Sequence, residues 1–272
     1  MAHAGHKTTP RSRSVAPLPG SPAGPWQGRR IAITGANGSL GRALIRVLHR
    51  QGATIVALTS AAAGADTPLL ECDDAGVPIP LELVTWCCGA EAELAGVLAG
   101  VDVLVLNHGV NVHSTRSADA TALSLEVNAL SSWRLLELFA GLEPGPQASA
   151  AGGRPREVWV NTSEAEIQPA LSPLYELSKR LLGQLVSLRA LDLAGPGLRI
   201  RRLVLGPFRS ALNPIGVMGA DFVAREVVRQ AGWNLGLVIV TPNPLTYVLM
   251  PLATLGRWLY FRLLTRPPVD GV

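Results

Sequence analysis

The sequence has few charged residues and no acidic residue in its first 65 positions. Only 16% of the 272 residues are charged while 48% are hydrophobic, which is too apolar a composition for a disordered chain. The 24 Lys and Arg residues include 8 that precede the first acid, Asp66. The remaining 16 basic residues face 20 acidic ones, so the chain lacks the basic face of a nucleic-acid-binding protein.

Cysteine is also scarce. Cys72, Cys87 and Cys88 form an odd set without the spacing of a metal site, which excludes a disulfide framework and predicts a reducing, cytoplasmic location. His108 and His113 have no Cys or carboxylate partner nearby in the sequence, so we predict no metal site.

Composition divides the chain into three parts. Residues 1–27 are rich in Ala, Pro, Ser, Gly and Arg without hydrophobic periodicity, and we expect a disordered leader. A transit peptide is the alternative, although five prolines disfavour an amphipathic helix there. Residues 28–243 are expected to form one nucleotide-binding domain, and residues 244–272 an apolar C-terminal helix.

From Arg30 onward, short apolar runs alternate with longer segments of helical periodicity. The expected strands are Ile31–Thr34, Ile55–Leu58, Leu81–Trp86, Val101–Leu106, Val158–Asn161, Ile200–Leu205 and Gly236–Val240. The expected helices are Leu40–Gln51, Ala90–Leu98, Ala118–Phe139, Ser172–Leu193 and Ala220–Gln230. This alternation predicts an α/β fold with a doubly wound parallel sheet, a Rossmann-like three-layer α/β/α single domain.

A glycine-rich turn follows the first expected strand and opens a helix. Glycines at such a turn let the backbone approach a pyrophosphate, and the helix N-terminus supplies N–H donors. An ordinary glycine-rich turn is the alternative on spacing alone. The predicted nucleotide-binding residues of this turn are Gly35, Asn37, Gly38, Ser39, Leu40, Gly41 and Arg42.

Tyr175 and Lys179 are four residues apart on an expected helix and therefore share one face. An ammonium at about 5 Å, with an effective dielectric of about 20, favours the phenolate by about 3 kcal/mol. We therefore expect Lys179 to lower the Tyr175 pKa from about 10 towards about 7.5, where a phenol serves as a proton donor at neutral pH. Taken alone, the pair is equally consistent with an accidental neighbour pair on an amphipathic helix.

Together these residues resemble the short-chain dehydrogenase/reductase superfamily over roughly residues 29–240. The matching motifs are the turn from Thr34 to Gly41, Asn107-His108-Gly109, Asn128, Ser163, and Tyr175 with Lys179. Within the superfamily, residues 107–113, 158–179 and 205–217 look most like the reductase half of cyanobacterial bifunctional sterol desaturase/short-chain dehydrogenase proteins, which implies lipid or sterol metabolism. Unlike many members, the chain has Ser39 in place of a glycine and His108 in place of a small residue.

The resemblance implies a role for each catalytic residue. Tyr175 is the general acid/base, and Lys179 holds the nicotinamide ribose and lowers the Tyr175 pKa. Ser163 orients the substrate oxygen, and Asn128 positions a water in a proton relay, although Asn within a helix also serves to cap or kink it. The interval from Ser163 to Tyr175 is one residue shorter than is common, which leaves Thr162 as a substitute for Ser163.

An NAD-binding protein has an acidic residue about twenty positions beyond the glycine turn, and its carboxylate binds the 2'-hydroxyl of the adenosine ribose. This chain has no acidic residue at that position. The second expected strand ends at Thr59 and Ser60, and with Arg42 these residues are expected to accept a 2'-phosphate, so we predict NADP rather than NAD. By resemblance, Pro207 and Phe208 form the turn that covers the nicotinamide, with Phe208 in place of glycine.

The loop of Asn107, His108 and Gly109 is expected to pack against the cofactor, and the segment after the sixth expected strand suggests the substrate. Residues 208–218 are mainly apolar and either border a pocket for a hydrophobic substrate or pack the next helix. We predict NADP(H)-dependent hydride transfer to or from a hydrophobic carbonyl or secondary alcohol. A nucleotide-binding sensor or scaffold without turnover is the alternative, and the presence of both Tyr175 and Lys179 argues against it.

The last apolar stretch has leucines at helical spacing, with Trp258 and Tyr260 beside them. Pro251, Arg257 and Arg262 argue against a membrane-spanning helix but are compatible with one lying in a membrane interface. Packing on the domain, or on a partner subunit of a homo-oligomer, is the open alternative.

Overall fold

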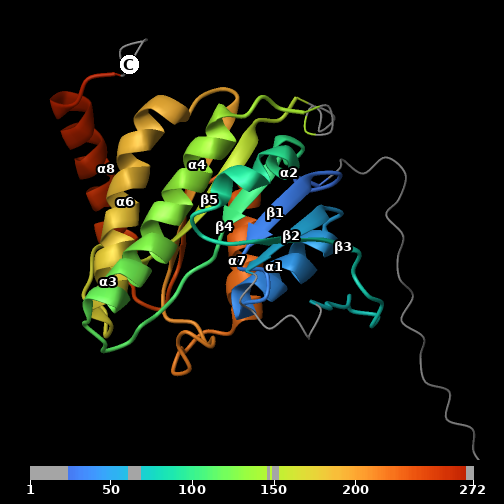
Figure 1. Ribbon diagram of the computed structural model, residues 1–272, viewed down its shortest axis with the longest axis horizontal. Helices are drawn as coiled ribbons and strands as arrows, with labels where there is room; N and C mark the ends of the chain where they lie inside the picture. Colours follow the sequence, from blue (N-terminus) through green and yellow to red (C-terminus); the bar gives the residue numbers. More distant parts are fainter. Residues whose placement is uncertain (1–23, 61–68, 146–147, 149–152, 268–272) are drawn as a thin grey trace, which may run out of the picture.

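The computed structural model describes residues 24–60, 69–145, 148 and 153–267. Its centre is a seven-stranded sheet in the order β3-β2-β1-β4-β5-β6-β7, with every pairing parallel. Helices cover both faces of this sheet (Figure 1). The predicted doubly wound, Rossmann-like α/β domain is confirmed.

The elements follow the sequence prediction closely. The strands are β1 (Arg30–Thr34), β2 (Thr54–Ser60), β3 (Leu81–Trp86), β4 (Val103–Leu106), β5 (Arg156–Ser163), β6 (Leu198–Leu205) and β7 (Leu237–Val240). The helices are α1 (Ser39–Arg50), α2 (Ala95–Ala99), α3 (Ala118–Leu125), α4 (Ser131–Gly141), α6 (Pro173–Leu193), α7 (Ala220–Gly232) and α8 (Thr246–Leu264). Short helical turns are η1 (Glu91–Leu94), η2 (Glu126–Leu130) and η3 (Glu164–Glu166).

Two predicted helices are interrupted. The segment expected as one helix from Ala118 to Phe139 consists of α3 and α4 joined by the π-helical turn η2, which contains Asn128. The segment expected from Ala90 to Leu98 begins with the 3-10 turn η1 before α2. Periodicity does not reveal such turns, because the apolar residues keep nearly the same spacing through them.

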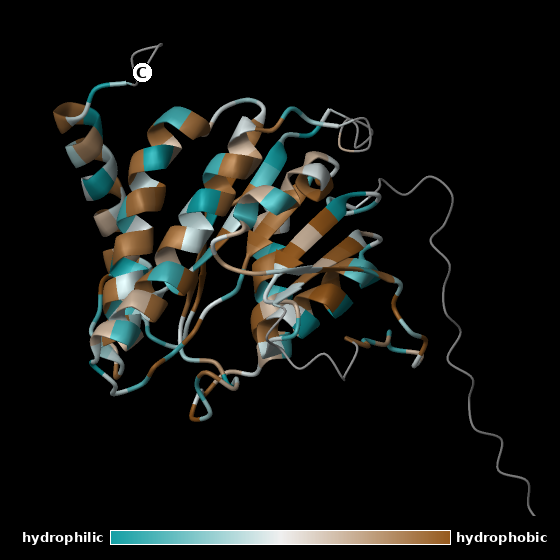
Figure 2. Cartoon of the chain, viewed as in Figure 1, coloured by the Kyte–Doolittle hydropathy of each residue, from teal (hydrophilic) through white to brown (hydrophobic). Residues whose placement is uncertain are grey.

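Alternating side chains divide the core into two layers. Ile31 and Ile33 point to the face covered by α1 and α7, whereas Ala32 points to the face covered by α2, α4 and α6. Figure 2 shows the resulting band of hydrophobic residues along the central strands. The doubly covered sheet explains why its strands are continuous apolar runs.

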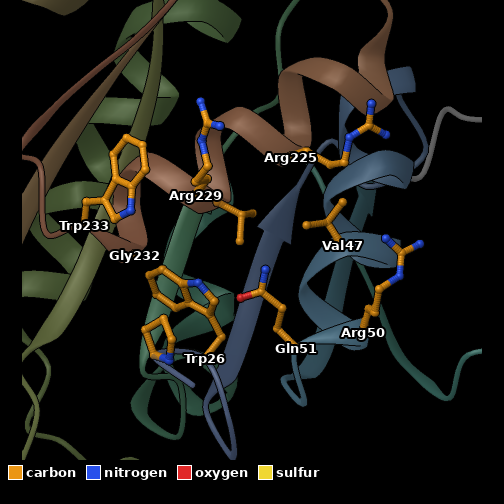
Figure 3. A pocket seen from close by; sticks show the side chains of 10 residues that line it. Trp26, Val47, Arg50, Gln51, Arg225, Arg229, Gly232 and Trp233 are labelled. Atoms are coloured by element: carbon orange, nitrogen blue, oxygen red, sulfur yellow. The ribbon is translucent and has the colours of Figure 1, made fainter. Parts of the chain in front are cut away.

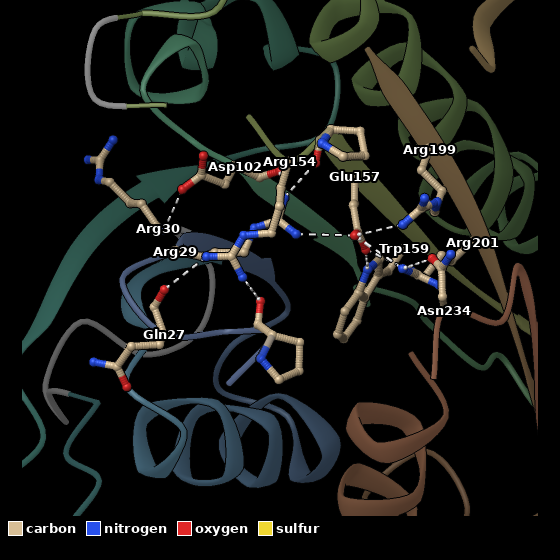
Figure 4. A network of polar contacts seen from close by, with 12 residues as sticks. Gln27, Arg29, Arg30, Asp102, Arg154, Glu157, Trp159, Arg199, Arg201 and Asn234 are labelled. Atoms are coloured by element: carbon tan, nitrogen blue, oxygen red, sulfur yellow. Dashed lines mark hydrogen bonds and ion pairs between the residues drawn. The ribbon is translucent and has the colours of Figure 1, made fainter. Parts of the chain in front are cut away.

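A buried ion network holds the amino ends of three strands together (Figure 4). Glu157 accepts hydrogen bonds from Arg29 at 3.1 Å, from Arg201 at 2.6 and 3.1 Å, and from the Trp159 indole at 2.8 Å. Burial raises the pKa of Glu157, but the hydrogen bonds from Arg201 and Trp159 outweigh it and hold the pKa below its usual value. The network therefore keeps a buried carboxylate ionised.

The segment before β1 reaches the same end of the sheet. Trp26 lies within the stretch expected to be a leader, yet it is buried and packs edge-to-face on Trp159 at 5.0 Å. A hollow of about 510 Å³ lies beside it between α1 and α7, lined by residues that include Val47, Arg229 and Trp233 (Figure 3). Residues 1–23 lie outside the described part of the chain.

Helix α8 lies along α6 at one side of the molecule (Figure 1). Met250 on its inner side is buried with Val204 and Ile239. None of the helices in the described ranges is both long and apolar enough to cross a membrane.

Candidate active site

The glycine turn brings backbone close to backbone between β1 and α1. Gly35 has φ +62°, and a Cβ there would lie 2.9 Å from the Cα of His108. A Cβ on Gly41 would lie 2.4 Å from the Gly35 carbonyl oxygen. Neither position accepts a side chain, so the turn presents backbone to whatever lies against it.

The start of α1 is open to an anion. Gly38 is its N-cap residue and provides no side-chain hydrogen bond, and the first turn contains no acid. The first N–H groups of a helix have no partner within the helix, and the positive end of the helix dipole favours negative charge. The turn that contains Asn37, Ser39 and Leu40 is therefore suited to a phosphate group.

Thr34 links this turn to the end of β4. Its hydroxyl accepts hydrogen bonds from the Asn107 N–H at 2.8 Å and the His108 N–H at 3.2 Å, and contacts His108 Nδ1 at 2.8 Å. The His108 ring packs edge-to-face on Trp86 at 5.2 Å. Burial lowers the pKa of His108 to about 4, so the ring is neutral.

A polar chain continues across the carboxyl edge of the sheet to α6. Asn161 Nδ2, on β5, donates to Asn107 Oδ1 at 2.9 Å. The Asn161 carbonyl oxygen accepts from Lys179 Nζ at 2.9 Å. Asn161 thus connects the glycine turn to the Tyr175–Lys179 helix, and the prediction treated it only as the end of a strand.

Tyr175 and Lys179 share a face as predicted, and Lys179 Nζ lies 5.6 Å from the centre of the Tyr175 ring. Burial raises the pKa of Tyr175, although a hydrogen bond with Ser163 acts in the opposite direction. Burial also lowers the pKa of Lys179 to about 8, against the effect of Glu166. The expected lowering of the Tyr175 pKa is wrong for the chain alone, because desolvation of the phenol outweighs its hydrogen bond with Ser163.

Ser163, rather than Thr162, belongs to this site. The Ser163 hydroxyl interacts with Tyr175, and it also accepts from the Ala165 N–H at 3.2 Å and donates to the Leu205 carbonyl at 3.3 Å. Thr162 points to the other side of β5, where its hydroxyl donates to the Leu203 carbonyl at 3.2 Å. The alternation of side chains along a strand separates the two hydroxyls.

Asn128 fastens the loop after β4 to the helices behind it. Its Oδ1 accepts from the Val110 N–H at 2.7 Å. Its Nδ2 donates to the Val110 carbonyl at 2.9 Å and to Ser178 Oγ at 3.0 Å. The side chain is fully buried, and a Cβ on Gly109 would approach its Oδ1 to 3.1 Å. Asn128 therefore braces the loop and marks the π-helical turn, and its role in a proton relay stays a prediction.

The residues expected to accept a 2'-phosphate are only partly free. Thr59 and Ser60 end β2, with Ser60 exposed, and residues 61–68 after them lie outside the described part. Arg42 donates to the Asn37 carbonyl at 3.0 Å and pairs with the buried Glu71 at 2.8 Å. Nothing in the local sequence signals Glu71, because 29 residues separate it from Arg42.

The segment after β6 packs against the core at its base, and its role at a substrate pocket stays a prediction. Phe208 and Met218 pair in an isolated bridge and pack against the core, and the Pro207 carbonyl accepts from the Met218 N–H at 3.3 Å. Ile215 and Val217 at the tip of the segment are exposed. The base of the segment is therefore core packing, and its tip carries exposed apolar side chains.

The chain is similar in sequence to known proteins. The NAD dependent epimerase/dehydratase family model matches residues 31–190. The chain is 45% identical over 240 residues to the monoglucosyldiacylglycerol epimerase of Synechocystis sp., and this match covers 88% of the chain but only 56% of that longer protein. It is 29% identical over 197 residues to human L-xylulose reductase, covering 70% of the chain and 72% of the reductase.

Two solved structures share the fold. A short-chain dehydrogenase from Sphingobium yanoikuyae in complex with NADPH aligns with a TM-score of 0.64 and 17% identity, over 89% of this chain and 99% of that one. A short-chain dehydrogenase from Burkholderia cenocepacia in complex with NADP aligns with a TM-score of 0.63 and 18% identity, over the same shares of the two chains. With the family match and the sequence relatives, the resemblance inferred from the motifs is confirmed: the chain belongs to the NAD dependent epimerase/dehydratase family and is an NAD(P)-dependent enzyme of the short-chain dehydrogenase/reductase type.

Proposed function

We propose that this chain is an NADP(H)-dependent oxidoreductase that acts on a secondary hydroxyl or carbonyl of a lipid-like substrate, with Tyr175 as general acid/base. The observation that carries the proposal is the polar chain from Thr34 through Asn107 and Asn161 to Lys179. These contacts run along the edge of the sheet that carries the glycine turn, and they support a site there for the Tyr175 phenol and the Ser163 hydroxyl.

The described residues fit a dinucleotide. A turn without room for a Cβ at Gly35 or Gly41, followed by an uncapped helix start at Gly38, is the cradle that a pyrophosphate needs. Lys179, whose ammonium already donates to a carbonyl at this edge, is placed to bind the nicotinamide ribose. When bound, the nicotinamide supplies or accepts the hydride.

The protein's own part is proton transfer and orientation. In reduction, the Tyr175 hydroxyl gives its proton to the carbonyl oxygen as a hydride reaches the carbon. In oxidation, the phenolate takes the proton of the alcohol as the hydride leaves. A raised Tyr175 pKa keeps the phenol protonated at neutral pH and so favours its role as the acid. Ser163 donates to the same substrate oxygen and holds it against Tyr175.

For the substrate we propose the sugar of a glycosyl diacylglycerol. Support comes from the 45% identity to a monoglucosyldiacylglycerol epimerase and from the apolar loop tip formed by Ile215 and Val217. Epimerisation requires the same two half-reactions: one sugar hydroxyl is oxidised to a ketone, and the ketone is reduced again from its opposite face. The hydride and the proton removed in the first half are returned in the second, so no external reductant is consumed. This substrate also leads us to propose that the chain works at a membrane surface.

The preference for NADP rests on the end of β2, where Thr59 and Ser60 stand in place of a carboxylate. Arg42 can turn from Glu71 to a 2'-phosphate because Arg46 also pairs with Glu71 and continues to neutralise it. We expect NADPH to bind more tightly than NADH in fluorescence titrations, and Arg42→Ala to remove the difference. Equal affinities in the unaltered chain, or a preference for NADH, would overturn the choice.

The catalytic proposal is tested with Tyr175→Phe. We expect turnover to fall by about 10² to 10⁴ while the dissociation constant of NADPH stays nearly unchanged, because Lys179 still holds the ribose. Trp233→Phe, an exposed aromatic residue directly after α7, is the control and should keep full activity. The assays are reduction of hydrophobic ketones and, by NMR of the sugar protons, epimerisation of monoglucosyldiacylglycerol in detergent micelles. Nucleotide binding without turnover on any of these substrates would favour the sensor or scaffold instead.

A further inference from the structure

The outer side of α8 is an apolar surface that the rest of the described chain leaves uncovered. Leu252, Leu255 and Leu263 are 60%, 54% and 76% exposed, and Leu259 and Tyr260 lie beside them. In Figure 2 this helix, at the edge of the molecule, carries brown hydrophobic segments between pale and teal ones. A helix that is apolar on its solvent side is normally covered by another surface.

The charges on this helix have one sign. Residues 245–267 contain no Asp or Glu, and their basic residues are Arg257, Arg262 and Arg266. Arg262 lies over the Trp258 ring at 4.9 Å, and Arg266 is exposed. Within the described residues, neither of these two arginines pairs with an acid. Leucines flanked by Trp, Tyr and Arg are the composition of a helix that lies in a bilayer interface.

We propose that the outer side of α8, from Tyr247 to Arg266, is the docking surface for a lipid bilayer that contains anionic lipids. The proposal rests on the proposed function, because a diacylglycerol-based substrate resides in a bilayer. Charge complementarity selects this partner over a second copy of the chain. Headgroup phosphates neutralise Arg262 and Arg266, whereas a symmetric dimer through this face would bring the same cations together.

Polar contacts on its inner side hold α8 in the orientation that docking requires. Arg257 points inward and pairs with the buried Glu166 at 2.6 Å. A Cβ on Gly183 of α6 would lie 2.3 Å from Glu166 Oε2, so this glycine makes room for the pair between the helices. Arg202 approaches the same carboxylate at 3.4 Å. With Arg257 anchored inside, the apolar residues of α8 stay outside.

The first turn of α8 also touches the catalytic edge of the sheet. Thr246 Oγ1 donates to Glu164 Oε2 at 3.1 Å and accepts from Gln168 Nε2 at 2.7 Å. Glu164 and Glu166 belong to η3, which follows Ser163 directly in the chain. The docking helix and the Ser163 hydroxyl are therefore joined through one short turn, so the first turn of α8 lies close to Ser163.

The test is co-sedimentation of the full chain with vesicles of phosphatidylglycerol and phosphatidylcholine, and with vesicles of phosphatidylcholine alone. We expect binding to the mixed vesicles, and a loss of at least about tenfold in the variant Leu259→Glu/Leu263→Glu, because two charges enter the apolar contact. Leu70→Glu/Leu235→Glu is the matched control: it adds the same charge at exposed leucines elsewhere and should bind within about threefold of the unaltered chain. Arg262→Gln/Arg266→Gln should lose the preference for mixed vesicles.

Far-UV circular dichroism and NADPH affinity establish that each variant is folded. A full chain that stays in the supernatant with both kinds of vesicle would overturn the proposal. So would light scattering that shows a dimer broken by Leu259→Glu/Leu263→Glu without any change in vesicle binding, since a second copy would then cover α8. Vesicle binding is measured without nucleotide or substrate, so its outcome is separate from the result of the Tyr175→Phe test.

Discussion

Glu157→Gln is expected to destabilise the fold strongly, because this side chain neutralises a cluster of buried arginines. Arg29 and Arg201 are each 2% exposed, and both donate to the Glu157 carboxylate. The amide of glutamine keeps the shape of the side chain but removes the charge and turns one acceptor into a donor that faces guanidinium groups. The two arginines then remain buried without their counter-charge.

The hydrogen bonds to Glu157 indicate how much stability Glu157→Gln should lose. Four hydrogen bonds reach Glu157, three from guanidinium groups and one from the Trp159 indole. Removing one partner of a buried ion pair costs about 3–5 kcal/mol, a large part of the 5–15 kcal/mol that holds a typical domain together. The exposed pair of Arg30 with Glu82 is the comparison, and Glu82→Gln should cost about 0–1 kcal/mol.

The assay is urea denaturation followed by far-UV circular dichroism at pH 7 for the unaltered chain, Glu157→Gln and Glu82→Gln. The midpoint of Glu157→Gln should fall sharply, and its NADPH affinity under native conditions should be kept because the network lies at the opposite edge of the sheet from the glycine turn. A loss below about 1 kcal/mol, or equal losses in the two variants, would refute the reasoning.

Three further predictions concern NADPH binding and the stability of the fold at low pH. Gly41→Ala should weaken NADPH binding at least about tenfold in fluorescence titration, since its Cβ would lie 2.4 Å from a carbonyl oxygen, while Gly96→Ala, with open space around it, should bind normally. The affinity for NADPH should fall as the pH rises through about 8, where Lys179 loses its proton, and Lys179→Met should bind weakly at every pH; a flat profile in the unaltered chain would contradict this role. Hydrogen bonds from Arg134 overcome the burial of Glu91 and hold its pKa at about 2, so its contribution of roughly 3 kcal/mol is present above its unfolded pKa and lost as the pH falls from about 4.5 towards 2. Urea midpoints measured across this range should depend less on pH in Glu91→Gln, and unchanged dependence would show that the ion pair does not contribute.

The order of strands and helices could be predicted because it depends on local patterns. Runs of apolar residues that are buried on both faces, and helical periodicity between them, need no knowledge of the partners they pack against. The spacing of Tyr175 and Lys179 is equally local, since one helical turn places both on the same face. The glycine turn is visible for the same reason at Gly41, which is crowded by Gly35 and Ala36 nearby in the chain, whereas the crowding of Gly35 by His108 is not visible in the sequence.

The site's electrostatics could not be predicted in this way, because each group responds to residues far away in the chain. A pairwise estimate between Tyr175 and Lys179 omits the desolvation that the packed domain imposes on both, and it therefore has the wrong sign for the Tyr175 pKa. From the sequence, Arg42 is expected to be available for a 2'-phosphate, but in the folded chain it forms an ion pair with Glu71.

By itself, then, the sequence determined the parallel α/β layout, the glycine turn and the presence of a Tyr–Lys pair on one helix. Only the tertiary structure decided that Asn161 bridges the glycine turn to Lys179, that Ser163 rather than Thr162 meets Tyr175, and that α8 turns its leucines outward. The physical reason is that backbone conformation follows from neighbouring residues, whereas hydrogen-bond partners and burial depend on which surfaces the folded chain brings together.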